Sequence, residues 1–265
     1  MTAAAAGPDG LWIRRFSPAD DARVRLVCFP HAGGSATFYF PVARALAPAI
    51  DVLAVQYPGR QDRRGEPCVD DMGRLADLVT EELRPWTDRP LALFGHSMGA
   101  LLGFEVARRL ERDGIRPLRF FASGRRAPMR RRSDEDVHRR DDQRLIAELT
   151  SLSGTDAQIL DDPEVLQLVL PAIRSDYRAV ETYRYAPGEP LRCPVSVLTG
   201  DSDPQVTLDE AEDWRHCVAG HFDVTVYPGG HFYLTEHAGA VMAEIRRRLA
   251  DTALPSPIGT APRLH

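Results

Sequence analysis

Short apolar runs of five or six residues alternate along this chain with longer segments in which apolar and polar positions are mixed. The runs are rich in Val, Leu, Ile and Phe and are too short for helices, so each predicts a buried strand. The predicted strands cover residues 24–29, 51–56, 90–94, 118–123, 195–199 and 222–227. An earlier stretch, residues 11–16, is a candidate antiparallel edge strand.

The longer segments predict helices that separate these strands. The predicted helices cover residues 38–47, 72–86, 98–112, 207–218 and 232–250. Thr207 and Glu210 have the spacing of a capping box, which marks the start of one helix. Strands that alternate with helices predict βαβ units and a mostly parallel sheet with helices on its faces, so the fold class is α/β.

One interval breaks this alternation, because no strand signal occurs between residues 123 and 195. Residues 125–142 are densely charged, whereas residues 145–152 and 165–183 have helical patterns. Pro171 lies inside the second pattern and should kink or split that helix. We interpret residues 125–190, approximately, as a helical lid inserted in a single domain that spans residues 1–265. The proline-containing tail, residues 251–265, is predicted to be loosely ordered.

Length, charge and cysteine content narrow the classes of protein. A chain of 265 residues suits one α/β domain. The net charge of −5 argues against a nucleic-acid partner, and no apolar run approaches the roughly 20 residues of a membrane span. The four cysteines form no CxxC pair, and the N-terminal residues do not have the pattern of a secretion signal. We therefore expect a cytoplasmic protein with no nucleic-acid or membrane partner, and we predict that it is a monomer.

The chain contains no lysine, so all 33 residues counted as Lys or Arg are arginines. This excludes a phosphate-binding loop with its lysine, and it excludes Schiff-base chemistry. The eight histidines have no HExxH or similar metal-binding spacing. We therefore expect neither a cofactor nor a metal.

The most informative motif is Gly-His-Ser-Met-Gly at residues 95–99, between a predicted strand and a predicted helix. Glycines on both sides of Ser97 permit a sharp turn that holds the serine hydroxyl out at the edge of a sheet. Ser97 could instead be only the N-cap of the following helix. The strand–turn–helix context favours a nucleophile.

A serine nucleophile needs a base that accepts its proton and an acid that orients the base. His231 follows one predicted strand in a Gly-Gly-His sequence, whereas Asp201 and Asp203 follow another. The order Ser, Asp, His is that of α/β-hydrolases, and all three would lie at the carboxyl edge of the sheet. Either aspartate could be only a turn residue, and His231 could only cap a helix. The side chain of His96 should point away from Ser97.

The loop Pro-His-Ala-Gly-Gly at residues 30–34 follows an early predicted strand. An oxyanion hole needs two backbone N–H donors, one after the nucleophile and one from such a loop. We assign these donors to Met98 and Ala32. The loop could instead be an ordinary glycine-rich turn, and His31 could contact substrate or only support the loop.

Five motifs together resemble the type II thioesterases, the stand-alone α/β-hydrolases that accompany polyketide synthases and nonribosomal peptide synthetases. They are residues 30–34, Gln-Tyr-Pro-Gly-Arg at 56–60, residues 95–99, Gly-Asp-Ser-Asp-Pro at 200–204 and Gly-Gly-His-Phe at 229–232. The resemblance covers roughly residues 11–249, and residues 170–177 look like the family's lid segment. It implies Ser97 as nucleophile, His231 as general base and then acid, and Asp203 rather than Asp201 as its orienting acid. It also implies an oxyanion hole formed by the amides of Ala32 and Met98.

The resemblance also implies an activity, which is the hydrolysis of acyl thioesters on the phosphopantetheine arm of acyl or peptidyl carrier proteins. Such enzymes remove aberrant acyl groups during the biosynthesis of polyketides and nonribosomal peptides of the antibiotic type. The alternatives are a carboxylester hydrolase, a chain-releasing thioesterase, and a non-enzymatic carrier-binding scaffold.

An arginine cluster at the start of the predicted lid is either a solvated, mixed-charge helix or a basic patch for an acidic carrier protein or the phosphate of its arm. The cluster comprises Arg125, Arg126, Arg130, Arg131, Arg132, Arg139 and Arg140.

Overall fold

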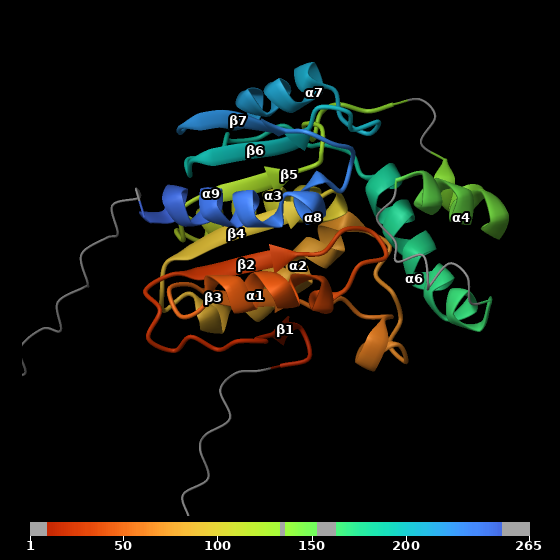
Figure 1. The fold of residues 1–265 in the computed structure, drawn as a ribbon, viewed down its shortest axis with the longest axis horizontal. Helices are drawn as coiled ribbons and strands as arrows, with labels where there is room; N and C mark the ends of the chain where they lie inside the picture. The colour runs from red at the N-terminus through yellow and green to blue at the C-terminus, as the bar shows by residue number, and fades with distance from the viewer. Residues whose placement is uncertain (1–9, 133–135, 153–162, 251–265) are drawn as a thin grey trace, which may run out of the picture.

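Seven strands form one sheet in the computed structural model, which describes residues 10–132, 136–152 and 163–250 (Figure 1). The strands are β1 (Ile13–Arg14), β2 (Arg25–Phe29), β3 (Asp51–Val55), β4 (Leu91–His96), β5 (Phe120–Ser123), β6 (Val195–Gly200) and β7 (Phe222–Tyr227). Their order in the sheet is β1-β3-β2-β4-β5-β6-β7. Every pairing is parallel except that of β1 with β3, so the predicted antiparallel edge strand is confirmed, although it is shorter than residues 11–16. The tail 251–265 and the lid residues 133–135 and 153–162 lie outside the described residues.

Helices cover both faces of this sheet, as Figure 1 shows. One layer contains α2 (Met72–Leu83) and α3 (Met98–Arg112), and the other contains α1 (Phe40–Leu46), α8 (Tyr233–Glu236) and α9 (Ala238–Ala250). A short helix, α7 (Leu208–Glu212), follows β6 and begins with the predicted capping box of Thr207 and Glu210. Between β5 and β6 the chain forms α4 (Asp142–Ser151) and α6 (Pro163–Thr182), which lie beyond the carboxyl ends of the strands.

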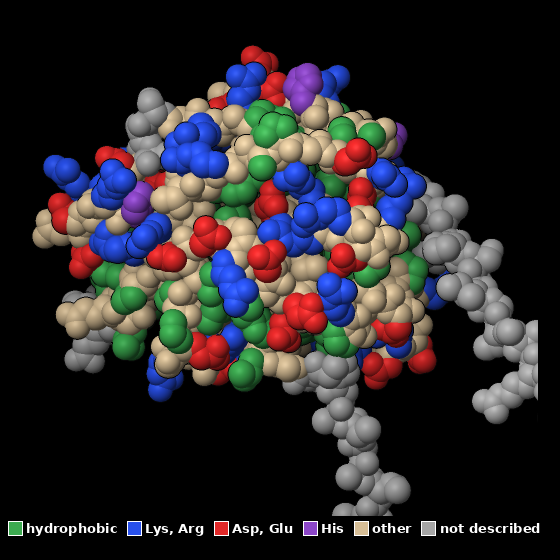
Figure 2. Space-filling model, turned by 180° about the vertical axis from the view of Figure 1, so that it is seen from behind, with side chains coloured by type: hydrophobic (Ala, Val, Ile, Leu, Met, Phe, Trp, Pro, Cys, Tyr) green, Lys and Arg blue, Asp and Glu red, His purple; other side chains and the backbone are tan. Residues whose placement is uncertain are grey.

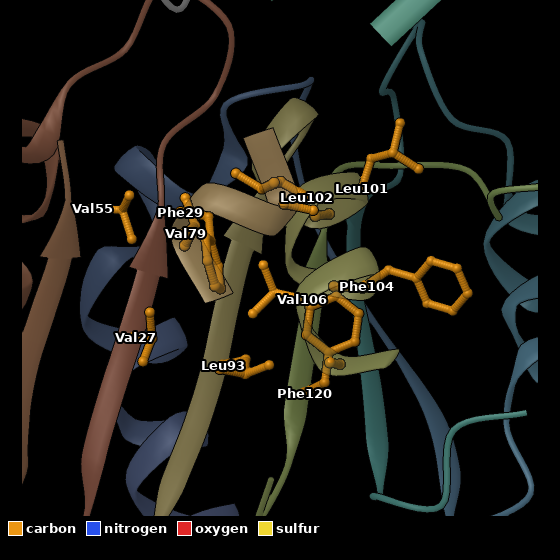
Figure 3. Close-up of a cluster of buried hydrophobic side chains, with 14 of the residues drawn as sticks. Val27, Phe29, Val55, Val79, Leu93, Leu101, Leu102, Phe104, Val106 and Phe120 are labelled. Atoms are coloured by element: carbon orange, nitrogen blue, oxygen red, sulfur yellow. The ribbon is translucent and has the colours of Figure 1, made fainter. Parts of the chain in front are cut away.

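The burial of the central strands on both faces explains why they appear in the sequence as continuous apolar runs. All residues of β2, β3 and β4 are buried, because each of these strands has helices on both of its faces. Figure 3 shows Val27, Leu93 and Phe120 from the sheet packed with Val79 of α2 and with Val106 of α3. The layer of α2 and α3 therefore holds β4 and its carboxyl end in a fixed place.

Four predicted helices differ from the observed ones. Residues 38–47 begin as a 3-10 turn, Ala36–Tyr39, before α1, and residues 72–86 form α2 followed by a 3-10 turn, Arg84–Trp86. Residues 207–218 form α7 followed by the 3-10 turn Asp213–Cys217. Residues 232–250 divide into α8 and α9 at His237. In each case one apolar pattern in the sequence covers two consecutive elements of the structure. Tertiary packing, and not only periodicity, decides where a helix ends.

Of the two effects expected of Pro171, a kink or a split, the split does not occur, because α6 is continuous from Pro163 to Thr182. Pro171 lies on the exposed side of α6, whereas Leu170, Ala172 and Ile173 are buried. The proline removes one hydrogen bond, that to the carbonyl of Gln167, which also lies on the exposed side, where water can solvate it. The buried residues on either side of Pro171 then hold the helix together.

Candidate active site

Ser97 occupies a strained turn between β4 and α3. Its backbone has φ 55° and ψ −117°, a conformation that a non-glycine residue rarely adopts. Its N–H donates a hydrogen bond of 2.8 Å to the carbonyl of Ser123 at the end of β5. The turn therefore places Ser97 at the carboxyl edge of the sheet, as expected for a nucleophile elbow.

Steric crowding requires glycine on both sides of this turn. A Cβ atom at Gly95 would collide with the carbonyl oxygen of Gly99, and one at Gly99 would collide with the carbonyl oxygen of Phe29. Because β2, β4 and the start of α3 approach so closely, a side chain at either position would push α3 away from the sheet. The Gly-x-Ser-x-Gly spacing is thus a packing requirement as well as a chemical signal.

His231 and Asp203 form a buried hydrogen-bonded pair. Nδ1 of His231 lies 2.9 Å from Oδ2 and 3.0 Å from Oδ1 of Asp203, and the side chains are 3% and 0% exposed. The N–H of Gln205 donates to Oδ1 of Asp203 at 2.8 Å and so fixes the carboxylate. A carboxylate accepts a hydrogen bond from Nδ1–H and so keeps the proton on Nδ1, which leaves the lone pair of Nε2 available as a base.

Asp201 has a different environment, although it lies only two residues away. It is exposed and accepts hydrogen bonds from the Ser202 hydroxyl at 2.8 Å and from the N–H of Gly229 at 3.0 Å. These bonds tie together the loops that follow β6 and β7. Asp201 therefore has the contacts of a turn residue, and Asp203 has those of an orienting acid.

Ser97 and His231 line the same small cavity, of about 50 Å³, together with Ala32 and Met98. A second cavity, of about 20 Å³, is lined by Ser97, His231, Ala32 and His31. Side chains from the lid helices close the first cavity, including Tyr177 of α6 and Leu152 at the end of α4. The structure thus brings together the four residues predicted to attack, accept the proton and bind the oxyanion, with Asp203 behind His231.

A larger cavity, of about 470 Å³, lies between α1 and the pair α8–α9. Its walls are mostly apolar and include Phe38, Phe94 and Met242, but not Ser97, His231 or Asp203. We place the candidate active site at the smaller cavities, because Ser97 and His231, the candidate nucleophile and base, both line them.

Three histidine rings lie next to one another behind the turn. The ring of His96 is 4.9 Å from that of His231 and 6.1 Å from that of His31 between centroids. Nδ1 of His96 is hydrogen-bonded to the Ser123 hydroxyl at 2.9 Å, so its side chain points into the sheet layer, where β5 lies. Burial, together with the charge of His231, lowers the pKa of His31 to about 3 and holds the pKa of His96 well below its usual value. Both rings are therefore neutral around pH 7.

The lowered pKa of His31 predicts how the free energy of unfolding depends on pH. Below pH 6.5 the unfolded chain binds a proton on His31, whereas the folded protein excludes it until about pH 3. Stability is therefore fully present above pH 6.5 and is lost as the pH falls, by about 1.4 kcal/mol per pH unit for this group. Urea unfolding of the wild type and of His31→Gln between pH 6.5 and 4 measures the effect.

We expect the His31→Gln variant to lose less stability per pH unit than the wild type. The control is His216→Gln, because the His216 side chain is 67% exposed and should not change the slope. Equal slopes for the wild type and His31→Gln would contradict the burial of a neutral His31.

Arg126 lies in the interior, so the prediction that it belongs to a solvated helix or a docking patch is wrong for this residue. Arg125 is partly buried and lines the cavity that contains Ser97. Burial, reinforced by the positive charge of Arg132, lowers its pKa to about 10. Arg126 is 1% exposed and donates a hydrogen bond to the Gln205 carbonyl. Charge density in the sequence did not distinguish these arginines from the surface ones.

Two further expectations concern metal binding and membrane insertion. Among residues 10–132, 136–152 and 163–250, no group of three or more His, Cys, Asp or Glu side chains is arranged to hold a metal ion. None of the helices in the described parts of the chain has the length and apolar character needed to cross a membrane.

Comparison with known proteins points to one family. Residues 24–249 match the family model of the thioesterase domain. The chain is 54% identical over 246 residues to the "Probable cadicidin biosynthesis thioesterase" of Streptomyces griseus, covering 92% of this chain and 68% of that protein. It is 50% identical over 245 residues to Thioesterase PikA5 of Streptomyces venezuelae, covering 92% and 87%. The solved structure of the type II thioesterase BorB from the borrelidin biosynthetic cluster has a TM-score of 0.86 and 52% identity, covering 91% and 98%.

Proposed function

Since this chain belongs to the thioesterase family, we propose that Ser97, His231 and Asp203 are its catalytic triad. The protein is a serine hydrolase of the α/β-hydrolase fold that acts on thioesters, and its relatives serve polyketide and nonribosomal peptide pathways. The observation that carries the triad is the buried hydrogen bond between His231 and Asp203, beside the cavity that His231 shares with Ser97.

The first half-reaction acylates the serine. Nε2 of His231 removes the Ser97 proton while Oγ attacks the thioester carbonyl carbon, and Asp203 stabilises the imidazolium that forms. The amides of Ala32 and Met98 donate hydrogen bonds to the carbonyl oxygen as it becomes an oxyanion. When the tetrahedral intermediate collapses, the carbon–sulfur bond breaks and the thiolate leaves. His231 returns its proton to the sulfur.

The second half-reaction releases the acyl group. His231 removes a proton from a water molecule, whose oxygen attacks the ester carbonyl of acyl-Ser97. The same two amides stabilise the second oxyanion. Collapse breaks the bond to Oγ, His231 returns the proton to Ser97, and a carboxylic acid leaves. No cofactor enters either half-reaction.

We propose that the thiol is the phosphopantetheine arm of an acyl or peptidyl carrier protein, and that the acyl groups are short. The cavities beside Ser97, of about 50 and 20 Å³, are small compared with the cavity of about 470 Å³ between α1 and the pair α8–α9. Leu152 and Tyr177 close them from the lid side. Residues 125–190 would then act as the lid of a single domain, and small aberrant acyl groups would fit beneath it.

A side-by-side hydrolysis assay tests this function. The substrates are one short acyl group on a phosphopantetheinylated carrier protein, on N-acetylcysteamine and on a matched oxygen alcohol. A kcat/KM much higher for the carrier thioester than for the other two supports the proposal. Equal or faster turnover of the oxygen ester would make the protein a general esterase and would overturn the carrier assignment.

Ion pairs neutralise three of the lid arginines. Arg130 pairs with Asp213, Arg132 with Glu210 and Arg140 with Asp136. On the face of the protein seen in Figure 2, basic and acidic side chains are interspersed. Arg131 and Arg139 are exposed, and no carboxylate in the described parts of the chain pairs with either. These two arginines are the members of the cluster that remain available to an acidic carrier protein.

Reversing both charges, in an Arg131→Glu/Arg139→Glu variant, should raise KM for the carrier substrate roughly 10-fold at low salt. The effect should shrink as salt is added, because ions screen exposed charges. KM for the N-acetylcysteamine thioester should not change. Arg192→Glu is the matched control, because Arg192 is 70% exposed but lies before β6, at the opposite edge of the sheet. Equal effects on the two substrates would contradict docking at these arginines.

A further inference from the structure

A carboxylate from the lid helix α6 reaches the loop that carries the Ala32 amide. Oδ2 of Asp176 accepts a hydrogen bond of 2.8 Å from the N–H of Gly33, the residue directly after Ala32. Asp176 is 1% exposed, so this bond is shielded from water. An ionised acceptor makes a stronger hydrogen bond than a neutral one, which favours a single position for the Gly33 amide.

Arg60 holds the same carboxylate from the other side. Its two terminal nitrogens donate to Oδ2 and Oδ1 of Asp176, each at 2.8 Å, in a bidentate pair. One of these nitrogens also donates to the Gly34 carbonyl at 3.0 Å. Burial works to lower the pKa of Arg60, but the charge and hydrogen bonds of Asp176 outweigh it and raise that pKa above its usual value. The guanidinium therefore keeps its charge beside the carboxylate, and the pair touches the loop at two successive residues.

Packing fixes the rest of this loop. A Cβ atom at Gly33, which has φ 75°, would come 2.8 Å from Cγ1 of Ile173, so α6 lies directly on the loop. The Arg60 guanidinium stacks over the Tyr57 ring, 5.0 Å from its centroid, and the Tyr57 hydroxyl donates to the Pro30 carbonyl at 3.1 Å. The loop is thus held at residue 30 and again at residues 33 and 34, with Ala32 between these points.

We propose that Asp176 is a positioning residue for the oxyanion hole, and that Arg60 holds Asp176 in place. This inference rests on the proposed function, in which the Ala32 amide binds the oxyanion. Oxyanion stabilisation depends steeply on where the donor points, because the donor must meet charge that develops only in the transition state. Loosening the loop should therefore lower kcat and leave KM nearly unchanged. The lid helix α6 therefore helps to position the oxyanion hole in addition to covering the acyl group.

The test is Asp176→Asn, which keeps the shape of the side chain and an oxygen for the Gly33 amide but removes the charge. We expect kcat for the N-acetylcysteamine thioester to fall roughly 10- to 100-fold, as a small displacement of a catalytic group does, with KM within about 3-fold. The matched control is Asp70→Asn. Asp70 pairs with Arg178 of the same helix at 3.1 Å, but both side chains are about half exposed and neither contacts the loop. Its kcat should stay within about 2-fold of wild type.

A transition-state analogue separates positioning from a general structural role. A trifluoromethyl ketone forms a tetrahedral adduct with the serine and places an oxyanion in the hole. In Asp176→Asn its inhibition constant should rise by about the same factor by which kcat/KM falls. A protein that is merely less stable would lose active enzyme, while the remaining molecules would keep the wild-type inhibition constant.

A second variant covers the case in which Asp176→Asn leaves Arg60 unpaired and does not fold. The double variant Arg60→Gln/Asp176→Asn removes both charges and retains hydrogen-bonding groups at both positions. Circular dichroism establishes folding, and the same losses of kcat and inhibitor affinity are expected. Wild-type kcat in a folded variant would overturn the positioning role alone, provided that Ser97→Ala is inactive. An active Ser97→Ala would instead refute the proposed function itself.

Discussion

Replacing Ser97 with alanine should lower kcat for thioester hydrolysis by roughly 10⁶-fold, the loss typical when a triad serine is removed. The hydroxyl oxygen forms the bond to the acyl carbon in the proposed mechanism, and alanine has no group that replaces it. Single-turnover measurements should detect no acyl-enzyme. The expected rate is that of the residual catalysis by the oxyanion hole and bound water.

The fold should survive this substitution, because alanine keeps the Cβ atom and the backbone N–H that donates to Ser123. The backbone strain at φ 55° is the same for serine and alanine. Thermal unfolding followed by circular dichroism checks this. The control is Ser202→Ala, an exposed serine whose hydroxyl donates to Asp201, which should retain activity. Hydrolysis by folded Ser97→Ala at the wild-type rate would exclude Ser97 as the nucleophile.

The second large effect should come from Asp203→Asn, which we expect to lower kcat roughly 10⁴-fold. The carboxylate accepts a hydrogen bond from Nδ1–H of His231, whereas an asparagine amide can present its NH₂ group and favour the other tautomer. Nε2 would then carry a proton and could not accept one from Ser97. Because Asn has the shape of Asp and the pair is buried, the loss should arise in the chemistry and not in substrate binding.

Asp201→Asn is the matched control for this prediction. Asp201 lies two positions before Asp203 and accepts hydrogen bonds from Ser202 and Gly229. The Asp201→Asn substitution should change kcat by no more than about 3-fold, because it alters only an exposed polar side chain. If Asp201→Asn were the more damaging variant, the assignment of the orienting acid would be reversed. Steady-state kinetics of both variants with one small thioester decide the matter.

Local patterns in the sequence were enough to predict the sheet and the nucleophile turn. Strands such as β2 and β4 are buried on both faces, so their apolar runs are visible without any knowledge of their neighbours. The Gly-x-Ser-x-Gly turn is also a short-range feature, because the clash at Gly95 involves Gly99, four residues away. The antiparallel edge strand and the capping box at Thr207 were predicted for the same reason.

The contacts of neighbouring residues needed the tertiary structure. Asp201 and Asp203 lie in one turn, and the family resemblance favoured Asp203, but only the approach of the loop after β7 shows that Asp203 contacts His231 while Asp201 contacts Gly229. Charge density likewise suggested that Arg125 is on the surface, whereas the fold places it in the wall of the Ser97 cavity. Helix boundaries at His237 and the continuity of α6 through Pro171 also follow from packing.

The sequence by itself therefore determined the α/β class, the order of the proposed triad residues and the glycine-flanked turn at Ser97, because these depend on periodicity and on contacts within a few residues. The tertiary structure showed that Asp203, the aspartate favoured by the family resemblance, lies against His231, and it alone joined Asp176 to Arg60 and to Gly33. Those partners are separated by 116 and 143 positions along the chain. No spacing rule connects residues so distant, and a buried charge finds its partner only where packed elements bring the two together.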